Sequence, residues 1–257
     1  MILPTLDGEG NELERTVQSI LATEPFELLL VTIDANLKKA INMVSKMPAY
    51  HAGRVRCLSV GNPNKRRQMA RAVPEVKTTI TIFADDDIIW PHSLLPWILA
   101  PFENPSMGGV VTKQRLIRPE IKDFFHWNWV HLNSLYLIRR TFDCSATTYM
   151  DGAMPCLSGR TCAYRSSILQ DERFLTRFIH ESFCFGRYRL NCDDDNFITR
   201  WLMTHKWKIF IQCNKECEVR TTLEANPKYL KQCVRWARSN WRSNLTTLFR
   251  DWRVVYR

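Results

Sequence analysis

The 257-residue sequence lacks several features that would narrow its class at once. It has no apolar run of the roughly 18 to 20 residues that a membrane-spanning helix needs, and no signal peptide is visible. Its nine cysteines include no CxxC pair, which argues against a zinc ribbon or a thioredoxin-like motif. We find no internal repeat and no low-complexity segment. We therefore expect a soluble or peripheral globular chain with reduced thiols in a cytosolic setting.

Acidic side chains are also too few to balance the basic ones. The sequence has 36 Lys and Arg against 26 Asp and Glu, which gives a net charge of +10. The basic residues concentrate at 65–67, at Arg71 and from Lys228 to Arg257. Such a charge suits nucleic acid, an anionic membrane surface or a phosphorylated substrate, and it leaves these three partners open.

The order of apolar patterns predicts an α/β fold. A continuous apolar run predicts a buried strand at residues 26–33, and further strands are expected at 55–60, 79–84, 108–114 and 207–212. Helices are expected where apolar residues recur with helical spacing, at residues 9–21, 37–47, 65–73, 124–140, 195–204 and 227–249. This alternation indicates a mostly parallel sheet with helices on both faces. The pattern is less regular in the second half, so we place a soft boundary near residue 110.

Three consecutive carboxylates, Asp85, Asp86 and Asp87, follow the expected strand at 79–84. In a parallel sheet, ligands bind beyond the carboxyl ends of the strands, where Asp34 also falls. Adjacent carboxylates repel one another unless a cation neutralises them, and their hard oxygens suit Mg²⁺ or Mn²⁺. The alternative is an exposed acidic turn or a helix cap. The buried strand before the triplet favours a metal site that bridges to phosphates.

A second acidic triplet, Asp193–Asp195, precedes the expected helix at 195–204. It fits a helix N-cap, for which Asp is favoured, and equally a general base that deprotonates a hydroxyl. Upstream, residues 158–165 comprise a glycine-containing loop and then Tyr164 and Arg165. Such a segment can approach a ligand closely.

The C-terminal helix presents Gln232, Arg235 and Trp236 on one face, because they stand at positions i, i+3 and i+4. Arginine can hold a diphosphate with two hydrogen bonds, and tryptophan offers a flat face for a sugar. The alternative is a basic amphipathic helix at a membrane surface.

In their order and spacing, these motifs resemble family 2 glycosyltransferases, specifically the processive synthases of the hyaluronan, chitin and cellulose type. The resemblance extends from residue 2 to about residue 245. It implies one continuous GT-A domain, with a nucleotide-sugar-binding half at 1–110 and an acceptor-binding half at 111–257, which ends in basic, tryptophan-rich amphipathic helices. Such synthases carry transmembrane helices on both sides of this domain, so we expect a fragment or a truncated form.

The resemblance assigns the donor site position by position. Asp34 matches the nucleotide-binding Asp after the second strand. Lys65 and Arg66 match a basic Gly-Lys-Arg turn, with Asn64 in place of Gly. Asp85 and Asp87 match the DxD motif, which binds the diphosphate and its Mg²⁺ or Mn²⁺ ion.

The resemblance likewise assigns the acceptor side. Cys192-Asp193-Asp194 matches Gly-Asp-Asp, which makes Asp194 the expected catalytic base; Cys192 replaces the Gly, and Asp195 replaces the Arg that follows. Residues 156–165 are similar to the loop behind the acceptor site of hyaluronan synthases. The QxxRW motif is matched by Gln232, Arg235 and Trp236, with Trp236 expected to stack on the acceptor sugar.

The function so implied is inverting, metal-dependent transfer from a UDP-sugar to a growing β-linked polysaccharide. Asp194 would deprotonate the acceptor hydroxyl while UDP leaves, stabilised by the metal, Lys65 and Arg235. The expected partners are the UDP-sugar, the oligo- or polysaccharide acceptor and a membrane, reached through flanking segments or the basic C-terminal region, but no nucleic acid. We expect the domain to be membrane-associated and to face the cytosol.

Two alternatives remain open. One is a non-processive family 2 transferase that adds a single sugar to a lipid or protein. The other is a basic peripheral protein that binds membrane or nucleic acid without chemistry, although it leaves both acidic triplets unexplained. The motifs do not distinguish UDP-GlcNAc, UDP-GlcA and UDP-Glc as donors.

Overall fold

Strands and helices alternate along the chain in the computed structural model, which describes residues 1–184 and 186–251. The first part contains β1 (Ile2–Pro4), α1 (Asn11–Leu21), β2 (Leu28–Ile33), η1 (Asp34–Asn36), α2 (Leu37–Ser45), α3 (Ala49–Ala52), β3 (Val55–Val60), α4 (Lys65–Ala72), η2 (Val73–Glu75) and β4 (Ile80–Ala84). The middle part contains β5 (Ile88–Ile89), α5 (Leu94–Leu99), η3 (Ala100–Glu103), β6 (Met107–Thr112), β7 (Gln114–Leu116), α6 (Phe124–Asp151) and β8 (Thr161–Arg165). The last part contains α7 (Ser166–Leu169), α8 (Glu172–His180), β9 (Ser182–Phe183), β10 (Tyr188–Arg189), α9 (Asp194–Thr204), β11 (Lys208–Gln212), η4 (Lys215–Cys217), β12 (Val219–Thr221) and α10 (Lys228–Phe249).

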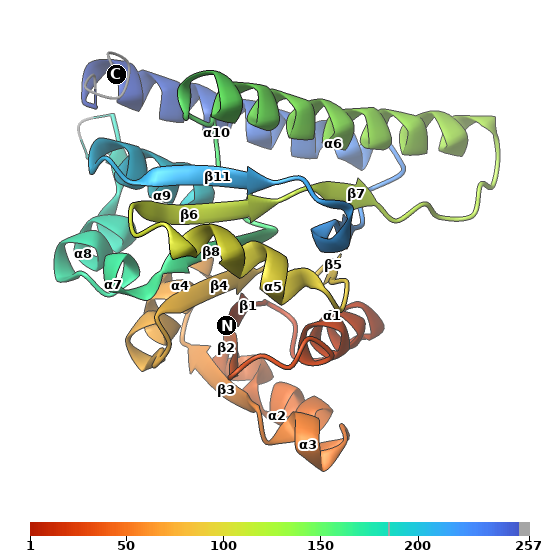
Figure 1. The fold of residues 1–257 in the computed structure, drawn as a ribbon. Coiled ribbons are helices and arrows are strands. Elements are labelled where there is room, and N and C mark those ends of the chain that lie inside the picture. The colour runs from red at the N-terminus through yellow and green to blue at the C-terminus, as the bar shows by residue number, and fades with distance from the viewer. Residues whose placement is uncertain (185, 252–257) are drawn as a thin grey trace.

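A seven-stranded sheet crosses the molecule in the order β11-β6-β8-β4-β1-β2-β3 (Figure 1). β1 pairs in parallel with β2 and β4, β2 with β3, and β11 with β6. Residue 110 lies inside β6, and strands from both sides of the soft boundary pair in this one sheet. Strands from both sequence halves therefore contribute to one mostly parallel sheet.

β8 is the one antiparallel strand of the large sheet, and it shapes the site. It lies between β4 and β6 and pairs with both in the antiparallel sense. Thr161 at its start is opposite Ala84 at the end of β4. The loop that precedes β8 therefore reaches the carboxyl edge of the sheet beside Asp85, whose N–H donates to the Arg160 carbonyl at 3.0 Å.

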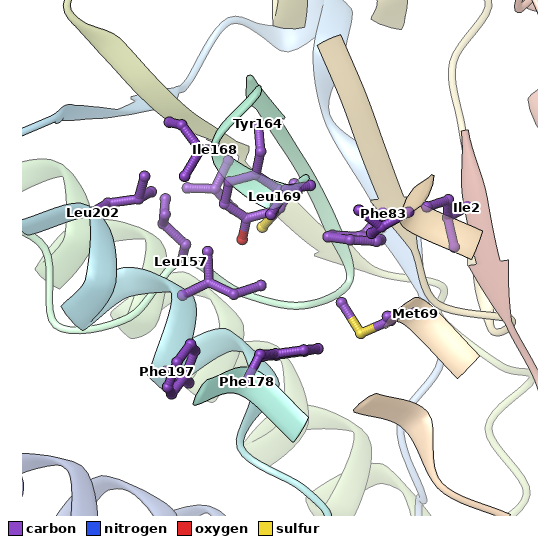
Figure 2. Close-up of a cluster of buried hydrophobic side chains, with 14 of the residues drawn as sticks. Ile2, Met69, Phe83, Leu157, Tyr164, Ile168, Leu169, Phe178, Phe197 and Leu202 are labelled. Carbon is purple, nitrogen blue, oxygen red and sulfur yellow. The ribbon is translucent and has the colours of Figure 1, made fainter. Parts of the chain in front are cut away.

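Alternating side chains of the strands fill two apolar clusters, as the period of two in a strand requires. In β2, Leu29 and Val31 enter one cluster, whereas Leu28 and Leu30 enter the other. Figure 2 shows the first cluster, where Phe83 and Ile2 from the sheet meet Met69 of α4 and residues of the second half. Burial on both sides explains why the central strands read as continuous apolar runs.

The structure changes two expectations in the second half. The helix expected at 124–140 continues to Asp151 and ends at Gly152, whose φ of 74° is accessible to glycine at no steric cost. Tyr164 and Arg165, expected in a ligand-facing loop, belong to β8 instead. Tyr164 is 1% exposed in the core, and Arg165 donates to the carbonyls of Phe102, Asn104 and Met107.

Two long helices, α6 and α10, lie together along one side of the molecule (Figure 1). They meet where the rings of Tyr136 and Trp236 stack, with centroids 4.8 Å apart. Within the part of the chain that the structure describes, neither these nor any other helix has the length and apolarity needed to cross a membrane.

Candidate active site

A cleft of about 690 Å³ opens at the carboxyl edge of the large sheet. Its walls come from the loops after β1 and β4, the start of α4, the loop before β8, the start of α9, and helices α6 and α10. Segments distant in sequence thus converge here, as parallel strands predict. Seven residues singled out from the sequence line it: Lys65, Asp85, Asp87, Asp194, Gln232, Arg235 and Trp236.

The Asp85–Asp87 triplet uses its three carboxylates differently. Asp86 accepts a hydrogen bond from the hydroxyl of Thr5 at 2.6 Å and anchors the β1 loop. Asp87 has a buried Oδ1 with no hydrogen-bond partner among the described residues. Burial, and next the charge of Asp85, raise the pKa of Asp87 to about 7. This carboxylate is therefore under-neutralised by the chain itself.

The two candidate metal ligands fit a hard divalent cation. Asp85 and Asp87 both line the cleft, and the orphaned Oδ1 of Asp87 offers an acceptor without a donor. No group of three or more His, Cys, Asp or Glu within residues 1–184 and 186–251 is arranged to hold a metal alone. Mg²⁺ is commonly bound by one or two carboxylates together with substrate phosphates, so a two-carboxylate site suits an ion that arrives with a diphosphate.

Lys65 connects the two acidic triplets. Its Nζ lies 2.7 Å from Oδ1 of Asp85 and 3.2 Å from Oδ2 of Asp194. Burial lowers the pKa of Lys65, but Asp194 and Asp85 outweigh it and raise this pKa well above its ordinary value. A Cβ on Gly159 would come within 3.3 Å of the same Nζ, so the glycine leaves room for the bridge. Lys65 is thus a fixed positive charge between the candidate metal ligands and the candidate base.

The second triplet begins helix α9. Asp193 is its N-cap position and pairs with Arg242 of α10, whereas Asp194 faces Lys65. Asp194 is 7% exposed and lines the cleft. Burial, and next the charge of Asp194, raise the pKa of Asp195, although Arg140 opposes this. All three line the cleft, and Asp194 is the one whose carboxylate pairs with Lys65, the cation that also contacts Asp85.

Helix α10 brings the QxxRW residues to the cleft wall. The Oε1 of Gln232 is buried and has no partner among the described residues, so it can accept a hydrogen bond from a ligand. Arg235 is exposed on the same wall. Trp236 is half-buried, and one face of its indole is covered by Tyr136. Only the remainder of the Trp236 ring is open to the predicted sugar.

Two predicted residues do not reach the cleft. Asp34 is exposed at the start of η1, beside Gly61, and does not line it. Arg66 is 1% exposed and turns to the other side of α4, because successive helix positions point in different directions. It donates to the carbonyls of Cys192 and Asp193, at 3.0 Å each, and so supports the loop of the base. The predicted roles of Asp34 and Arg66 in nucleotide binding stay predictions.

Sequence patterns missed several cleft residues. Arg140 of α6 lines the cleft near Asp195 and is isolated in sequence from both acidic triplets. Arg160, from the loop at 158–165 that the sequence did single out, also lines the cleft and donates to Gln114 and Thr221 at 3.1 Å each. Thr5 and Asp7, in the loop after β1, also line the cleft. The rule that ligands bind at carboxyl ends of strands was a signal that could have found these two.

With this geometry in place, comparisons identify the family. The sequence matches the family model described as "Glycosyltransferase like family 2" over residues 5–239, and the chain therefore belongs to this family. The motifs recognised from sequence fall within the matched segment.

Curated relatives agree with this assignment. A "Type 2 glycosyltransferase" of Zymoseptoria tritici is 58% identical over 249 residues, covering 97% of this chain and 51% of the relative. One of Gibberella zeae is 48% identical over 250 residues, covering 96% and 46%. "NDP-glycosyltransferase ltbB" of Aspergillus luteorubrus is 30% identical over 254 residues, covering 95% and 60%. The chain spans about half the length of the first two.

These relatives correct one part of the sequence-based assignment. Their names describe type 2 glycosyltransferases and an NDP-glycosyltransferase, and none of them names a processive polysaccharide synthase. The family is confirmed, whereas the processive subtype is not supported by these names.

Solved structures confirm the GT-A fold. Glucosyl-3-phosphoglycerate synthase of Mycobacterium tuberculosis, solved with Mn²⁺, UDP and phosphoglyceric acid, aligns with a TM-score of 0.54 at 17% identity, covering 95% of this chain and 76% of that one. Staphylococcus aureus TarS aligns with a TM-score of 0.53 at 16% identity, covering 91% and 38%. At such identities the likeness extends to the fold alone.

Proposed function

We propose that this glycosyltransferase moves a single sugar from a UDP-sugar to an acceptor hydroxyl, with inversion and with Mg²⁺ or Mn²⁺ at Asp85 and Asp87. One observation carries the proposal. A single cleft holds the DxD pair, a cation bridging to a second acidic residue, and an arginine-bearing helix. The relative named NDP-glycosyltransferase supports a nucleotide sugar as the donor.

The donor end of the cleft suits a diphosphate. A divalent ion held by Asp85 and Asp87 would supply positive charge to the departing diphosphate. Lys65 is already within hydrogen-bond distance of Asp85, so it can turn to a phosphate oxygen with little movement. Arg235, exposed on the facing wall, can add a charge-assisted hydrogen bond. Gln232 offers its unpaired oxygen to a hydroxyl.

The acceptor end is served by Asp194. Its carboxylate takes the proton of the acceptor hydroxyl, the acceptor oxygen bonds to the anomeric carbon, and the bond from that carbon to UDP breaks. The ammonium of Lys65 lies 3.2 Å from this carboxylate and helps to hold it in the cleft. Proton removal in the transition state by a positioned side chain contributes about 10² to 10⁴-fold to such reactions.

Repeated transfer along a polymer is the second candidate. The QxxRW residues on the cleft wall favour it, since they are the feature by which the sequence resembles processive synthases. The relatives' names favour single transfer. The two differ in product length, so a gel or mass spectrum of the products separates them.

We further propose that the face formed by α6 and α10 rests on an anionic membrane, on the cytosolic side. Large apolar side chains are exposed along both helices: Phe124, Phe125, Ile138, Phe142 and Tyr149 on α6, and Trp241, Leu248 and Phe249 on α10. Residues 225–250 contain six Lys and Arg and no Asp or Glu, a composition that complements anionic headgroups. All nine cysteines are free, as in a reducing compartment.

Vesicle binding tests this face. Replacing Phe142 and Trp241 by Glu should release the full-length protein from phosphatidylserine-containing vesicles, and neutral phosphatidylcholine vesicles should bind it more weakly. Phe26→Glu, an equally exposed phenylalanine far from both helices, is the control. Equal sedimentation of all variants with both vesicle types would exclude the membrane face.

Turnover tests the main proposal. The full-length protein should release UDP from at least one of UDP-GlcNAc, UDP-GlcA and UDP-Glc when Mn²⁺ is present, and chelation should stop the release. Salt-sensitive binding to RNA or vesicles without any UDP release would favour the non-enzymatic alternative and overturn the proposal.

A further inference from the structure

The loop that carries Asp194 is clamped from behind. We name residues 192–195 the base loop. Arg66, 1% exposed, donates to the carbonyls of Cys192 and Asp193, at 3.0 Å each, and pairs with Glu181 at 2.6 Å. Both carbonyls directly precede Asp194. The backbone from which the base projects is therefore held by buried hydrogen bonds.

Asp193 stands in a conformation that needs support. Its φ of 67° lies in the left-handed region, which residues other than glycine adopt infrequently. Its carboxylate is 8% exposed and forms an ion pair with Arg242 of α10. A buried carboxylate without a partner is costly, so Arg242 favours this conformation of the loop. Arg242 thereby acts on the residue next to the base.

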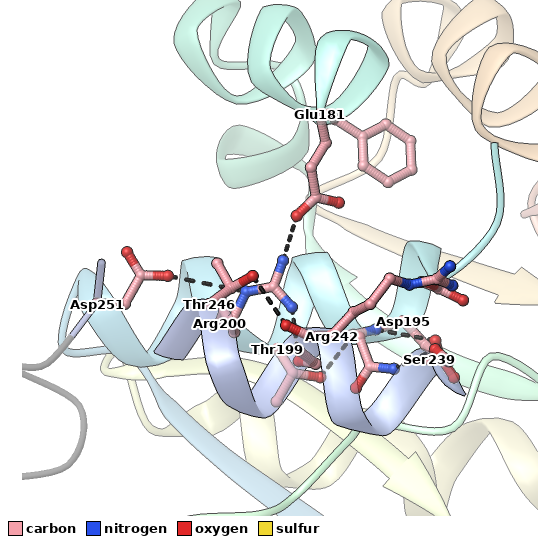
Figure 3. A network of polar contacts seen from close by, with 12 residues as sticks. Glu181, Asp195, Thr199, Arg200, Ser239, Arg242, Thr246 and Asp251 are labelled. Carbon is pink, nitrogen blue, oxygen red and sulfur yellow. Dashed lines mark hydrogen bonds and ion pairs between the residues drawn. The ribbon is translucent and has the colours of Figure 1, made fainter. Parts of the chain in front are cut away.

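Helix α10 is also attached to α9 beyond the base loop. Asn196 donates to Ser239 at 2.8 Å, and Arg200 donates to Ser243 at 2.6 Å. Arg200 pairs in addition with Glu181, the same carboxylate that Arg66 contacts (Figure 3). The base loop, α9 and α10 thus share one polar network.

The same helix α10 lines the cleft with Gln232 and Arg235, about two turns before Arg242. We propose that Arg242 is a positioning residue: through Asp193 it sets the orientation of Asp194 and ties the base to the helix that contacts the donor. This inference rests on the proposed role of Asp194. No contact of Arg242 with substrate is required, since its action passes through the base loop.

Steady-state kinetics of the full-length protein test this role. Arg242→Gln should lower kcat about ten- to hundredfold, because a misplacement of about 1 Å can cost a factor near 10². The KM for the UDP-sugar and the calorimetric affinity for UDP should stay within about twofold, since the donor ligands are untouched. Arg242→Lys should recover part of kcat. Asp193→Asn should lower kcat similarly, and the double variant should be little worse than either single one.

Matched controls distinguish positioning of Asp194 from a general effect on the stability of the fold. Arg71→Gln removes an exposed arginine–carboxylate pair with Glu75 and should leave kcat unchanged. Unchanged kcat in Arg242→Gln, or a lower melting temperature with unchanged kcat per folded molecule, would overturn the proposal. If Arg242→Gln does not fold, the comparison of Arg242→Lys with Asp193→Asn decides it in the same way. Absence of turnover in the natural protein would instead contradict the proposed function.

Discussion

Asp85–Asp87 and Asp193–Asp195 are both runs of three carboxylates in one cleft, yet their surroundings differ. In the first run, Asp86 is bound by Thr5, while an oxygen of Asp87 has no partner among the described residues. In the second, Asp193 is paired with Arg242, and Asp194 with Lys65. Lys65 contacts both runs, so what sets the first run apart is the oxygen of Asp87 that has no partner among the described residues.

This difference teaches how one sequence pattern acquires two roles. A carboxylate at a strand end whose oxygen has no partner among the described residues suits an external metal ion. At the helix start, Asp193 and Asp194 are instead held in place by Arg242 and Lys65.

The largest effect is expected for the base. Asp194→Asn removes the proton acceptor but keeps the side-chain shape, so the transfer rate should fall about 10² to 10⁴-fold. UDP binding, measured by calorimetry, should persist because Asp85 and Asp87 are intact. Asp171→Asn is the control, because Asn caps helix α8 as well as Asp does. Full transfer activity in Asp194→Asn would exclude Asp194 as the base.

The next largest effect is expected in the triplet Asp85–Asp87, as a loss of metal binding. Asp87→Ala should weaken Mn²⁺-dependent UDP binding by at least about 100-fold, since even outer-shell partners of metal ligands are worth about 10- to 100-fold. Asp86→Asn, in the same triplet, should have little effect because the amide oxygen can still accept from Thr5. If the two variants bound UDP and Mn²⁺ equally well, this would contradict the assignment of Asp87 as a metal ligand and of Asp86 as a structural residue.

Removing the positive charge of Lys65, which contacts Asp85 and Asp194, should affect both acidic triplets. Lys65→Gln is expected to raise the Kd for UDP about 10- to 100-fold, the equivalent of one charge-assisted hydrogen bond. Lys38→Gln, an exposed lysine on α2, is the control. An unchanged Kd would mean that Lys65 only balances the charge of the carboxylates and never contacts the donor.

The smallest effect is expected at Gly159, next to the ammonium of Lys65. The Cβ in Gly159→Ala would lie 3.3 Å from Nζ of Lys65 and 3.6 Å from Oδ2 of Asp194. Lys65 is flexible and can move by a few tenths of an ångström, so kcat should fall about tenfold or less. Gly53→Ala serves as the control, because its Cβ would meet only a backbone oxygen at 3.4 Å. An unchanged kcat would show that the side chain of Lys65 can be displaced without loss of activity.

Prediction from sequence succeeded where local pattern and burial agree. The strand expected at 79–84 matches β4 closely, because a strand buried on both sides is largely apolar. The strand expected at 55–60 coincides with β3, an edge strand that is only partly buried. The helix expected at 195–204 matches α9 because the triplet of Asp marks its start. The segment at 166–180 carried no such prediction, although it forms α7 and α8.

For the site, the sequence by itself determined which acids could matter and that the fold brings strand ends together. Only the tertiary structure decided the partner of each charge. It turned Arg66 away from the cleft, left Asp34 exposed outside it, and brought in Arg140. Neighbours in sequence point to different sides of a helix, and ion pairs form between residues distant in sequence. Charge pairing is therefore a property of packing, and no linear pattern records it.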